Sequence, residues 1–247
     1  MRFYVFASGS KGNCTVIRYK STCLMIDCGI TQRSLKENLS KYGMSVEDIT
    51  ACVFTHSHSD HIKGVKGLRG IPLYAPFEIR ERPDERDVVP YEEFRIGDLR
   101  ILPVKLSHDA PETVGYIVTG DEKLVMITDT GYVSERNFRL IQNAEYYIFE
   151  ANHDVEMLMR TNRPAVLKAR IISDYGHMNN EDTGVILSGV IGSNTREIVL
   201  AHLSEEANDP KLALDTVRDI ITGNGISLVN IKLRAASQWE SMEGGSL

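Results

Sequence analysis

Short apolar runs along the chain alternate with longer segments of helical periodicity. Runs rich in β-branched and aromatic residues, bounded by glycine, proline or small polar residues, predict strands. These strands span residues 2–7, 14–19, 24–29, 49–54, 70–74, 99–106, 113–119, 123–127, 145–149, 197–200 and 226–233. Apolar residues three or four positions apart predict helices over 32–42, from after Gly131 to about 143, over 155–172 with an interruption near Pro164, and over 181–192 and 209–222.

The order of these elements predicts an α/β fold. Strands come first, strands and helices then alternate, and the same succession follows again. Two αβ halves packed sheet to sheet, with helices outside, would produce this pattern. No break in composition marks a linker, so we expect one domain over residues 1–247. The charged stretch 80–93 predicts an exposed loop, and the small and polar residues from about 235 predict a frayed tail.

The composition is that of a globular protein and limits its partners. The 247 residues are 42% hydrophobic and 25% charged, with a net charge of −6. That charge excludes a basic protein that coats nucleic acid, although not a nuclease that binds it locally or through metal ions. The first apolar run is too short for a signal peptide, and no stretch approaches the ~20 apolar residues of a membrane helix. We therefore expect a cytoplasmic protein with no membrane partner. The four cysteines form no C-x-x-C pair and favour reduced core thiols over ligands or disulfides.

Candidate chemistry is concentrated in the segment 55–61. His56, His58, Asp60 and His61 fall within six residues, directly after the predicted strand 49–54. Alternate residues of an extended loop point the same way, so His56 and His58 can reach one metal ion. Asp60 and His61 lie on the next turn and can reach a second. Imidazole and carboxylate are ligands of zinc, iron and manganese, and their density here favours a metal site over ordinary surface residues.

The same arrangement recurs at other predicted strand ends. Ligand-type residues follow apolar strands at Asp27, His108, Asp129, within 150–154 and at His202. If these ends converge, one division gives the first ion His56, His58 and His108, gives the second Asp60, His61 and His202, and makes Asp129 a bridge. Two ions ~3.5–4 Å apart can share a hydroxide nucleophile and hold both the attacking and the leaving oxygen of a displacement. A set rich in imidazole and free of thiolate favours two divalent ions of Zn, Mn or Fe over Mg or Ca.

This succession of residues resembles the motifs of a known superfamily. The series His56-x-His58-x-Asp60-His61, His108, Asp129 and His202, with Asp27 in the first motif, is similar to that of the metallo-β-lactamase superfamily. The resemblance covers nearly the whole chain. It implies a four-layer αβ/βα sandwich (the metallo-β-lactamase fold) with a dinuclear site at one edge of the sheets.

Within that superfamily, the details resemble the phosphodiesterase branch. The pair Asp60-His61, the short interval from His108 to Asp129, and Asp129 where some lactamases have cysteine all fit this branch. His177 is similar to a histidine that tRNA 3′-processing nucleases carry before their last ligand. The resemblance implies that His177 binds no metal but contacts the scissile phosphate or protonates the leaving oxygen; the alternative is a turn or capping residue. Asp60 would also orient or deprotonate the attacking water.

Four further stretches resemble the YycJ/WalJ-type bacterial proteins, a family of metal-dependent DNA exonucleases that act from the 5′ end. These stretches are 7–13, 128–132, 150–158 and 167–171. The chain is too short for the inserted second domain of RNase J-type nucleases, and it has no glycine- and proline-rich arm of the kind that grips tRNA. The resemblance implies a nucleic acid substrate, with DNA favoured over RNA. It leaves the oligomeric state open, a homodimer included.

Five residues near this set have their own expected roles. Asp27 is expected to orient a ligand histidine rather than to bind metal. Ser8 and Asn13 either contact substrate or metal-bound water, or belong to a tight hairpin. Glu150 and His153 either line the pocket, with His153 near a metal, or cap the following helix.

Basic residues between 160 and 170, among them Lys168 and Arg170, either grip phosphates or are ordinary solvent-facing charges. The leading hypothesis is a dinuclear metal-dependent phosphodiesterase, a DNA exonuclease with a metal-bridging hydroxide as nucleophile. The alternative is a small-molecule hydrolase of the same fold, acting on a cyclic phosphodiester, a lactone or a thioester. A non-enzymatic di-iron redox module is disfavoured, because such domains tend to carry a glutamate where this chain has Ser59.

Overall fold

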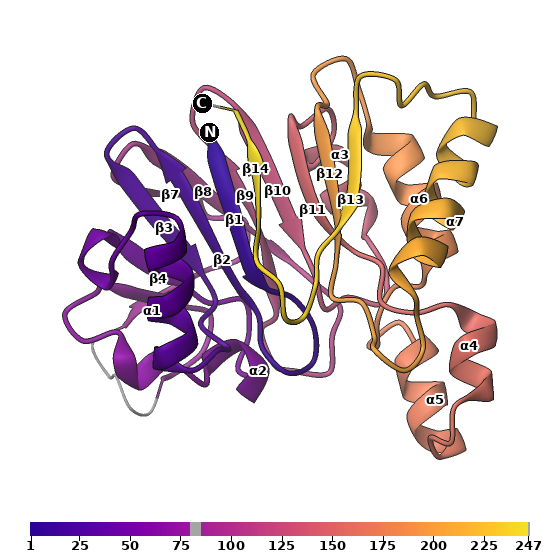
Figure 1. The fold of residues 1–247 in the computed structure, drawn as a ribbon, viewed down its shortest axis with the longest axis horizontal. Helices are drawn as coiled ribbons and strands as arrows, with labels where there is room; N and C mark the ends of the chain where they lie inside the picture. Colours follow the sequence, from indigo (N-terminus) through magenta and orange to yellow (C-terminus); the bar gives the residue numbers. More distant parts are fainter. Residues whose placement is uncertain (80–84, 247) are drawn as a thin grey trace.

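The strands form two mixed sheets. The computed structural model describes residues 1–79 and 85–246, and these residues form two seven-stranded sheets (Figure 1). The first sheet contains, in spatial order, β14 (Met242–Gly245), β1 (Arg2–Ala7), β2 (Cys14–Tyr19), β3 (Thr22–Ile26), β4 (Ala51–Val53), β5 (Leu73–Ala75) and β6 (Arg86–Asp87). The second contains β13 (Lys232–Ala235), β12 (Glu197–Ala201), β11 (Tyr146–Glu150), β10 (Lys123–Ile127), β9 (Val114–Thr119), β8 (Leu99–Lys105) and β7 (Phe94–Ile96).

Each sheet combines an antiparallel and a parallel part. In the first sheet, β1, β2 and β3 pair antiparallel, whereas β3, β4, β5 and β6 pair parallel. In the second, β7 to β10 pair antiparallel and β10 to β13 pair parallel. Parallel strands end at the same edge of a sheet, which is where open α/β folds bind ligands. The topology therefore gathers the residues that follow β3, β4, β10, β11 and β12, together with those after β8, which runs in the same direction as β10.

The helices of the described residues are α1 (Gln32–Lys41), α2 (Ser59–Ile62), α3 (Glu135–Leu140), α4 (Val155–Arg160), α5 (Ala165–Ile172), α6 (Asn180–Val190) and α7 (Pro210–Gly223), with 3-10 turns at Val46–Asp48 and Val65–Gly67. Some of them cover the outer faces of the sheets, whereas α4 and α5 pack in a small apolar cluster of their own. Figure 1 shows α1 outside the first sheet, and α6 and α7 outside the second. The predicted break near Pro164 is confirmed: this proline lies between α4 and α5, as the N-cap of α5, because its ring and missing N–H do not suit a helix interior.

Apolar side chains fill three layers. Between the sheets lies a core that includes the buried rings of Phe3 and Tyr116. A second core places Leu39 of α1 against the first sheet, and a third includes Leu187 of α6 and Val217 of α7 against the second sheet. The predicted four-layer αβ/βα sandwich is confirmed. Among the described residues, no helix is both long enough and apolar enough to span a membrane.

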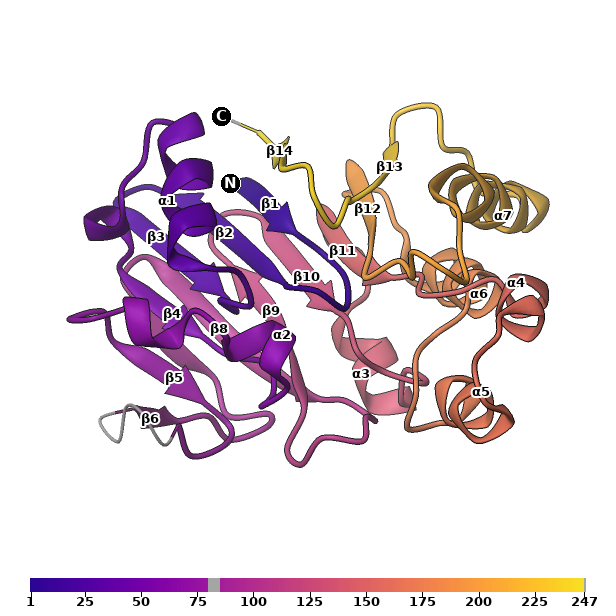
Figure 2. The same ribbon diagram turned by 60° about the horizontal axis from the view of Figure 1, so that its bottom comes forward.

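The chain differs from the sequence prediction near its C-terminal end. The predicted strand 226–233 was wrong in its extent: only Lys232–Ala235 pairs, as β13, because Ile226 and Leu228 pack into the core under the helices instead. The prediction of a frayed tail from about 235 is also wrong, because Met242–Gly245 forms a strand. β14 pairs antiparallel with β1, with Arg2 opposite Gly245 (Figure 2).

Two smaller differences concern the segment before β8. β7 was not predicted, although its three residues form a short hairpin with β8. Of the predicted loop 80–93, residues 80–84 lie outside the described residues, and Arg86–Asp87 adds β6 at the edge of the first sheet.

Candidate metal centre

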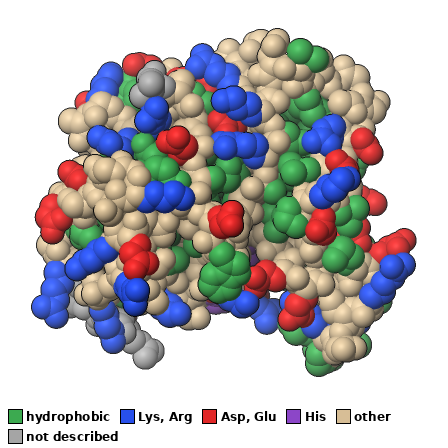
Figure 3. All heavy atoms as spheres, in the orientation of Figure 1, with side chains coloured by type: hydrophobic (Ala, Val, Ile, Leu, Met, Phe, Trp, Pro, Cys, Tyr) green, Lys and Arg blue, Asp and Glu red, His purple; other side chains and the backbone are tan. Residues whose placement is uncertain are grey.

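The predicted ligands meet at one edge of the two sheets. On the face drawn in Figure 3, histidine atoms reach the surface at the lower edge, beside hydrophobic, lysine and arginine side chains. All seven predicted ligand residues belong to groups whose ligand atoms lie within 4.8 Å of one another: His56, His58, Asp60, His61, His108, Asp129 and His202. The convergence predicted from strand ends is therefore what the fold produces.

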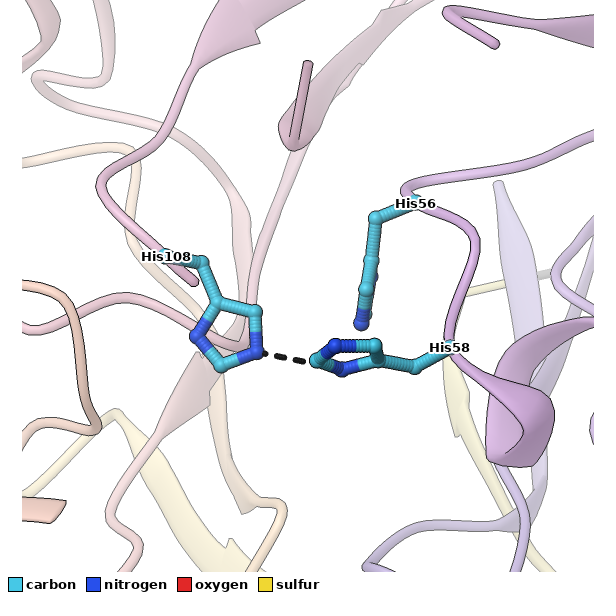
Figure 4. A group of neighbouring side chains, drawn as sticks. All are labelled: His56, His58 and His108. Atoms are coloured by element: carbon cyan, nitrogen blue, oxygen red, sulfur yellow. Dashed lines mark hydrogen bonds between the residues drawn. The ribbon is translucent and has the colours of Figure 1, made fainter. Parts of the chain in front are cut away.

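The first group consists of His56, His58 and His108. Figure 4 shows their three rings pointing toward one another from the β4–α2 loop and from the end of β8. His108 Nε2 lies 3.4 Å from His58 Nδ1, and the ring of His56 is 4.6 Å from that of His58 between centroids. Three imidazoles at this spacing, of which two are buried, match the ligand set expected for the first ion.

The second group consists of Asp60, His61 and His202, with Asp129 beside it. Asp129 Oδ2 is 3.4 Å from His61 Nε2, and its Oδ1 is 3.4 Å from His202 Nε2. Asp60 Oδ2 is 3.6 Å from His61 Nε2 and 4.0 Å from His202 Nε2. Asp129 also groups with His56 and His61, so its carboxylate lies between the two sets of ligands, as a bridging residue must.

The buried histidines of these groups hold one ring nitrogen each against a fixed partner. His56 Nδ1 lies 3.0 Å from Thr55 Oγ1, and His61 Nδ1 lies 2.8 Å from Asp27 Oδ2. His108 Nδ1 lies 3.2 Å from the Gly176 carbonyl oxygen, and His202 Nδ1 lies 3.1 Å from Glu150 Oε1. Such contacts fix the ring orientation and leave Nε2 as the candidate ligand atom.

Several atoms that face the centre lack partners. Among the described residues, the buried atoms without a hydrogen bond include His56 Nε2, His202 Nε2 and Asp129 Oδ2. Buried polar atoms in native proteins are nearly always satisfied. Unpaired imidazole nitrogens and a carboxylate oxygen converging on one point therefore fit divalent cations.

The backbone is strained where three of these residues lie. Asp27, Asp129 and His202 have φ angles of 59°, 61° and 55°, in the left-handed region. Non-glycine residues seldom adopt it, and the cost is about 1–3 kcal/mol at each position. Each lies within two residues of the end of a strand, so the turn out of the strand is what directs its side chain into the centre.

Burial and neighbouring charges move the pKa values of these groups in opposite directions. Burial and the adjacent His61 lower the pKa of His56. Burial would also lower the pKa of His61, but Asp27 and Asp129 outweigh it and raise that pKa to about 8. Burial would raise the pKa of Asp129, yet His202 and His61 hold it well below its usual range. The carboxylate of Asp129 thus stays ionised and attracts positive charge.

Glu150 connects the centre to His177. Its buried Oε1 lies 2.8 Å from His177 Nδ1 and 3.1 Å from His202 Nδ1, and Oε2 accepts a 2.9 Å hydrogen bond from the Thr130 N–H. Burial would raise the pKa of Glu150, but His177 and His202 lower it to about 2. Glu150 therefore orients two imidazoles; it does not cap the following helix, because Asp154 does.

His177 lies at the wall of a cavity of about 170 Å³, which Arg163, Arg170, His108 and His202 also line. The His177 side chain is 18% exposed. Arg170 pairs with Asp109, and Arg163 Nε is 2.9 Å from Glu206. The cavity brings a partly exposed imidazole and two guanidinium groups to the edge of the metal centre.

Other predicted residues divide between the centre and its surroundings. Ser8 Oγ accepts a 2.8 Å hydrogen bond from the His202 N–H. Asn13 bonds Gly9 and places its Nδ2 3.0 Å from His61 Nε2, so it belongs both to the hairpin and to the centre.

Two predicted residues fall outside the ligand groups. His153 is buried but belongs to none of the ligand groups found among the described residues. Burial lowers its pKa to about 4. Lys168 Nζ donates to the Met159 carbonyl at the surface and does not line the cavity.

Three residues of the centre had no assigned role in the sequence prediction. Thr55 donates from its N–H and its hydroxyl to Asp27, both at 2.9 Å. Asp109 Oδ1 lies 3.2 Å from His108 Nε2. Asn152 donates to the His202 carbonyl at 2.8 Å. Thr55 and Asp109 adjoin ligand histidines in the sequence, which is the signal that was available for them.

Comparisons with known proteins agree with this arrangement. Residues 22–203 match the family described as "Beta-lactamase superfamily domain". The chain is 34% identical over 242 residues to exodeoxyribonuclease YycJ of Bacillus anthracis, covering 92% of each chain. It is 36% identical over 228 residues to exodeoxyribonuclease WalJ of Streptococcus pneumoniae, covering 86% of this chain and 85% of the relative.

A solved structure shows the same fold. The metallo-β-lactamase fold protein YhfI of Bacillus subtilis superposes with a TM-score of 0.73 at 17% identity, over 98% of this chain and 99% of that one. The family match, the two relatives that share most of their length, and the common fold agree with the ligand succession read from the sequence. This chain belongs to the metallo-β-lactamase superfamily of hydrolases.

Proposed function

We propose that the protein is a dinuclear metal-dependent phosphodiesterase that degrades DNA as an exonuclease from the 5′ end. The observation that carries the proposal is the pair Glu150–His177, which sets a partly exposed imidazole beside the two ligand groups. The two relatives that match nearly the whole chain are exodeoxyribonucleases, which supports DNA as the substrate. The 5′ polarity rests on the resemblance of the motifs alone.

The candidate ligand atoms would divide between two ions of Zn, Mn or Fe. His56, His58 and His108 would hold the first and Asp60, His61 and His202 the second, with Asp129 between them. Ions held there would supply a hydroxide nucleophile and neutralise charge on the phosphate.

The protein's own residues would orient the substrate and move the protons. His177 is held through Nδ1 by Glu150, so its Nε2 is the atom available to give a proton to the leaving oxygen. Arg163 and Arg170 line the same cavity, and guanidinium groups suit phosphate oxygens. Asp60 is half-buried and lies at the edge of the second ligand group, where it would orient the attacking water.

The first test is hydrolysis of bis(p-nitrophenyl) phosphate by His58→Ala and Asp129→Asn variants. Asparagine tolerates the positive φ of Asp129, so the fold should persist. Both variants should lose turnover, while Asp98→Asn on an exposed hairpin should not. Far-UV circular dichroism checks folding, and unchanged turnover in either variant contradicts the two-metal assignment.

The second test compares substrates and polarity. Oligonucleotides labelled at either end, as single-stranded DNA, duplex DNA and RNA, are compared with a cyclic dinucleotide, a lactone and a thioester. Mononucleotide release from the 5′ end of DNA is expected. Faster turnover of any of the small esters than of DNA favours the small-molecule alternative.

A further inference from the structure

The only tryptophan of the chain is exposed and yet held in place. Trp239 is 68% exposed, and it follows β13 in the segment expected to fray. Its indole N–H donates to Glu205 Oε1 at 2.6 Å, and Lys11 Nζ lies 5.0 Å from the ring centroid. A large apolar ring that is kept in water and fixed by two charged side chains contributes little to the core and is suited to contact a ligand.

The neighbour of Trp239 anchors this segment to the metal centre. Gln238 is buried; its Oε1 accepts from the Lys11 N–H at 2.8 Å and its Nε2 donates to the Gly12 carbonyl at 2.9 Å. The same β1–β2 turn continues to Asn13, whose N–H donates to the Asp60 carbonyl at 2.8 Å. A short series of hydrogen bonds therefore fixes the indole relative to a proposed metal ligand.

One groove is lined both by Trp239 and by Asp60 of the metal centre. Its volume is about 530 Å³, and Trp239, Lys11, Ser59, Asp60 and Lys63 are among the residues that line it. That volume is in the range of small-ligand sites and suits a nucleotide. Lys63 is exposed, and no ion pair is recorded for it among residues 1–79 and 85–246, so its ammonium group is available to a phosphate.

We propose that this groove binds the substrate strand next to the scissile phosphate, with one nucleobase stacked on Trp239 and Lys63 on the backbone. The inference rests on the proposed function and adds a binding site to it. Aromatic stacking accepts any base, because each base has a π-face. A groove lined by an exposed aromatic ring, an exposed lysine and a proposed metal ligand matches a single strand that enters the centre.

The first experiment separates base stacking from a structural role. Initial rates are measured on the metal-loaded protein with a thymidine oligonucleotide and with a series in which one abasic residue is moved along the strand. Trp239→Ala should raise KM for the intact strand about 5-fold to 150-fold, the range expected for loss of one stacked base. Trp239→Phe should recover most of that loss. When the abasic residue occupies the stacked position, wild type and Trp239→Ala should have the same KM.

A second experiment uses the tryptophan itself. The chain has one tryptophan, so its emission reports this position alone. A hydrolysis-resistant phosphorothioate strand should quench the wild-type emission with the same midpoint at which it inhibits DNA hydrolysis, and Trp239→Phe supplies the blank.

Two results overturn the inference: unchanged emission at strand concentrations that inhibit hydrolysis, or a ratio of KM values between variant and wild type that no abasic position alters. The second result includes a variant that is merely misfolded, because its defect would not depend on the base. If the wild-type protein hydrolyses no DNA, the proposed function fails instead, and the two failures are distinct.

Discussion

Asp27→Asn should weaken metal binding without disturbing the backbone. Asp27 is fully buried and accepts three hydrogen bonds, from His61 Nδ1 at 2.8 Å and from the Thr55 N–H and hydroxyl at 2.9 Å each. Its φ of 59° would strain alanine, but asparagine tolerates this region. The substitution therefore changes one oxygen to an NH₂ group and little else.

The magnitude follows from where that NH₂ group must lie. If it faces His61, Nδ1 must accept and the ring proton moves to Nε2, the atom that faces Asp129 and the metal centre. If it faces Thr55 instead, two buried donors meet, at a cost of about 1–3 kcal/mol. Either arrangement should weaken binding of the second ion about 10-fold to 100-fold, which corresponds to about 1.4–2.7 kcal/mol.

The assay is calorimetric titration of Mn²⁺ or Zn²⁺ into chelator-treated protein. Wild type, Asp27→Asn and the control Asp98→Asn are compared, since the Asp98 carboxylate accepts hydrogen bonds from Ser21 on an exposed hairpin. Turnover of the variant should return toward the wild-type value at saturating metal. A dissociation constant within twofold of wild type, with unchanged melting temperature, would refute the role assigned to the Asp27–His61 contact.

Four further outcomes can be checked. His177→Gln should lower kcat on DNA about 10²-fold to 10⁴-fold but should affect bis(p-nitrophenyl) phosphate far less, because nitrophenolate leaves without a proton; equal losses on both contradict the acid role. Chelation should lower the melting temperature of wild type but not that of Asp129→Asn, because a ligand at 100 times its Kd stabilises by about 2.7 kcal/mol. Gly29→Ala should cost about 1–3 kcal/mol or more, since its Cβ would lie 1.5 Å from the Asp60 carbonyl oxygen; urea unfolding measures this. The four buried thiols, of Cys14, Cys23, Cys28 and Cys52, should react with a disulfide reagent only after unfolding, because burial excludes the reagent and raises the pKa of each thiol. Fast labelling of the native protein would contradict this prediction.

The sequence predicts well which candidate ligands converge, because their signal is local. Each candidate ligand lies in the segment that follows an apolar strand, and strands that run in one direction end at one edge of a sheet. His56 and His58 need only an extended loop after β4, and His202 needs only the end of β12. The chemistry of the side chains and their place after apolar strands therefore indicate which residues meet, without knowledge of the strand pairing.

Contacts between distant segments left no such signal. The role of Glu150 depends on His177, 27 residues later, and the sequence alone supported a helix cap equally well. β14 pairs with β1 across nearly the whole chain, and its sequence, with two glycines among four residues, has low strand propensity. Tertiary pairing, not local preference, orders that segment.

The β1–β2 turn unites the two sides of the proposed site. Ser10 lines both the cavity that contains His177 and the groove that contains Trp239. A Cβ on Gly9 would lie 2.6 Å from Gln238 Oε1, so the close approach of turn and tail requires glycine there. The sequence left open whether this turn is a plain hairpin or a contact with the site. Its hairpin geometry is what makes the contact, because the same few residues that close the turn also position the second ligand group and the indole.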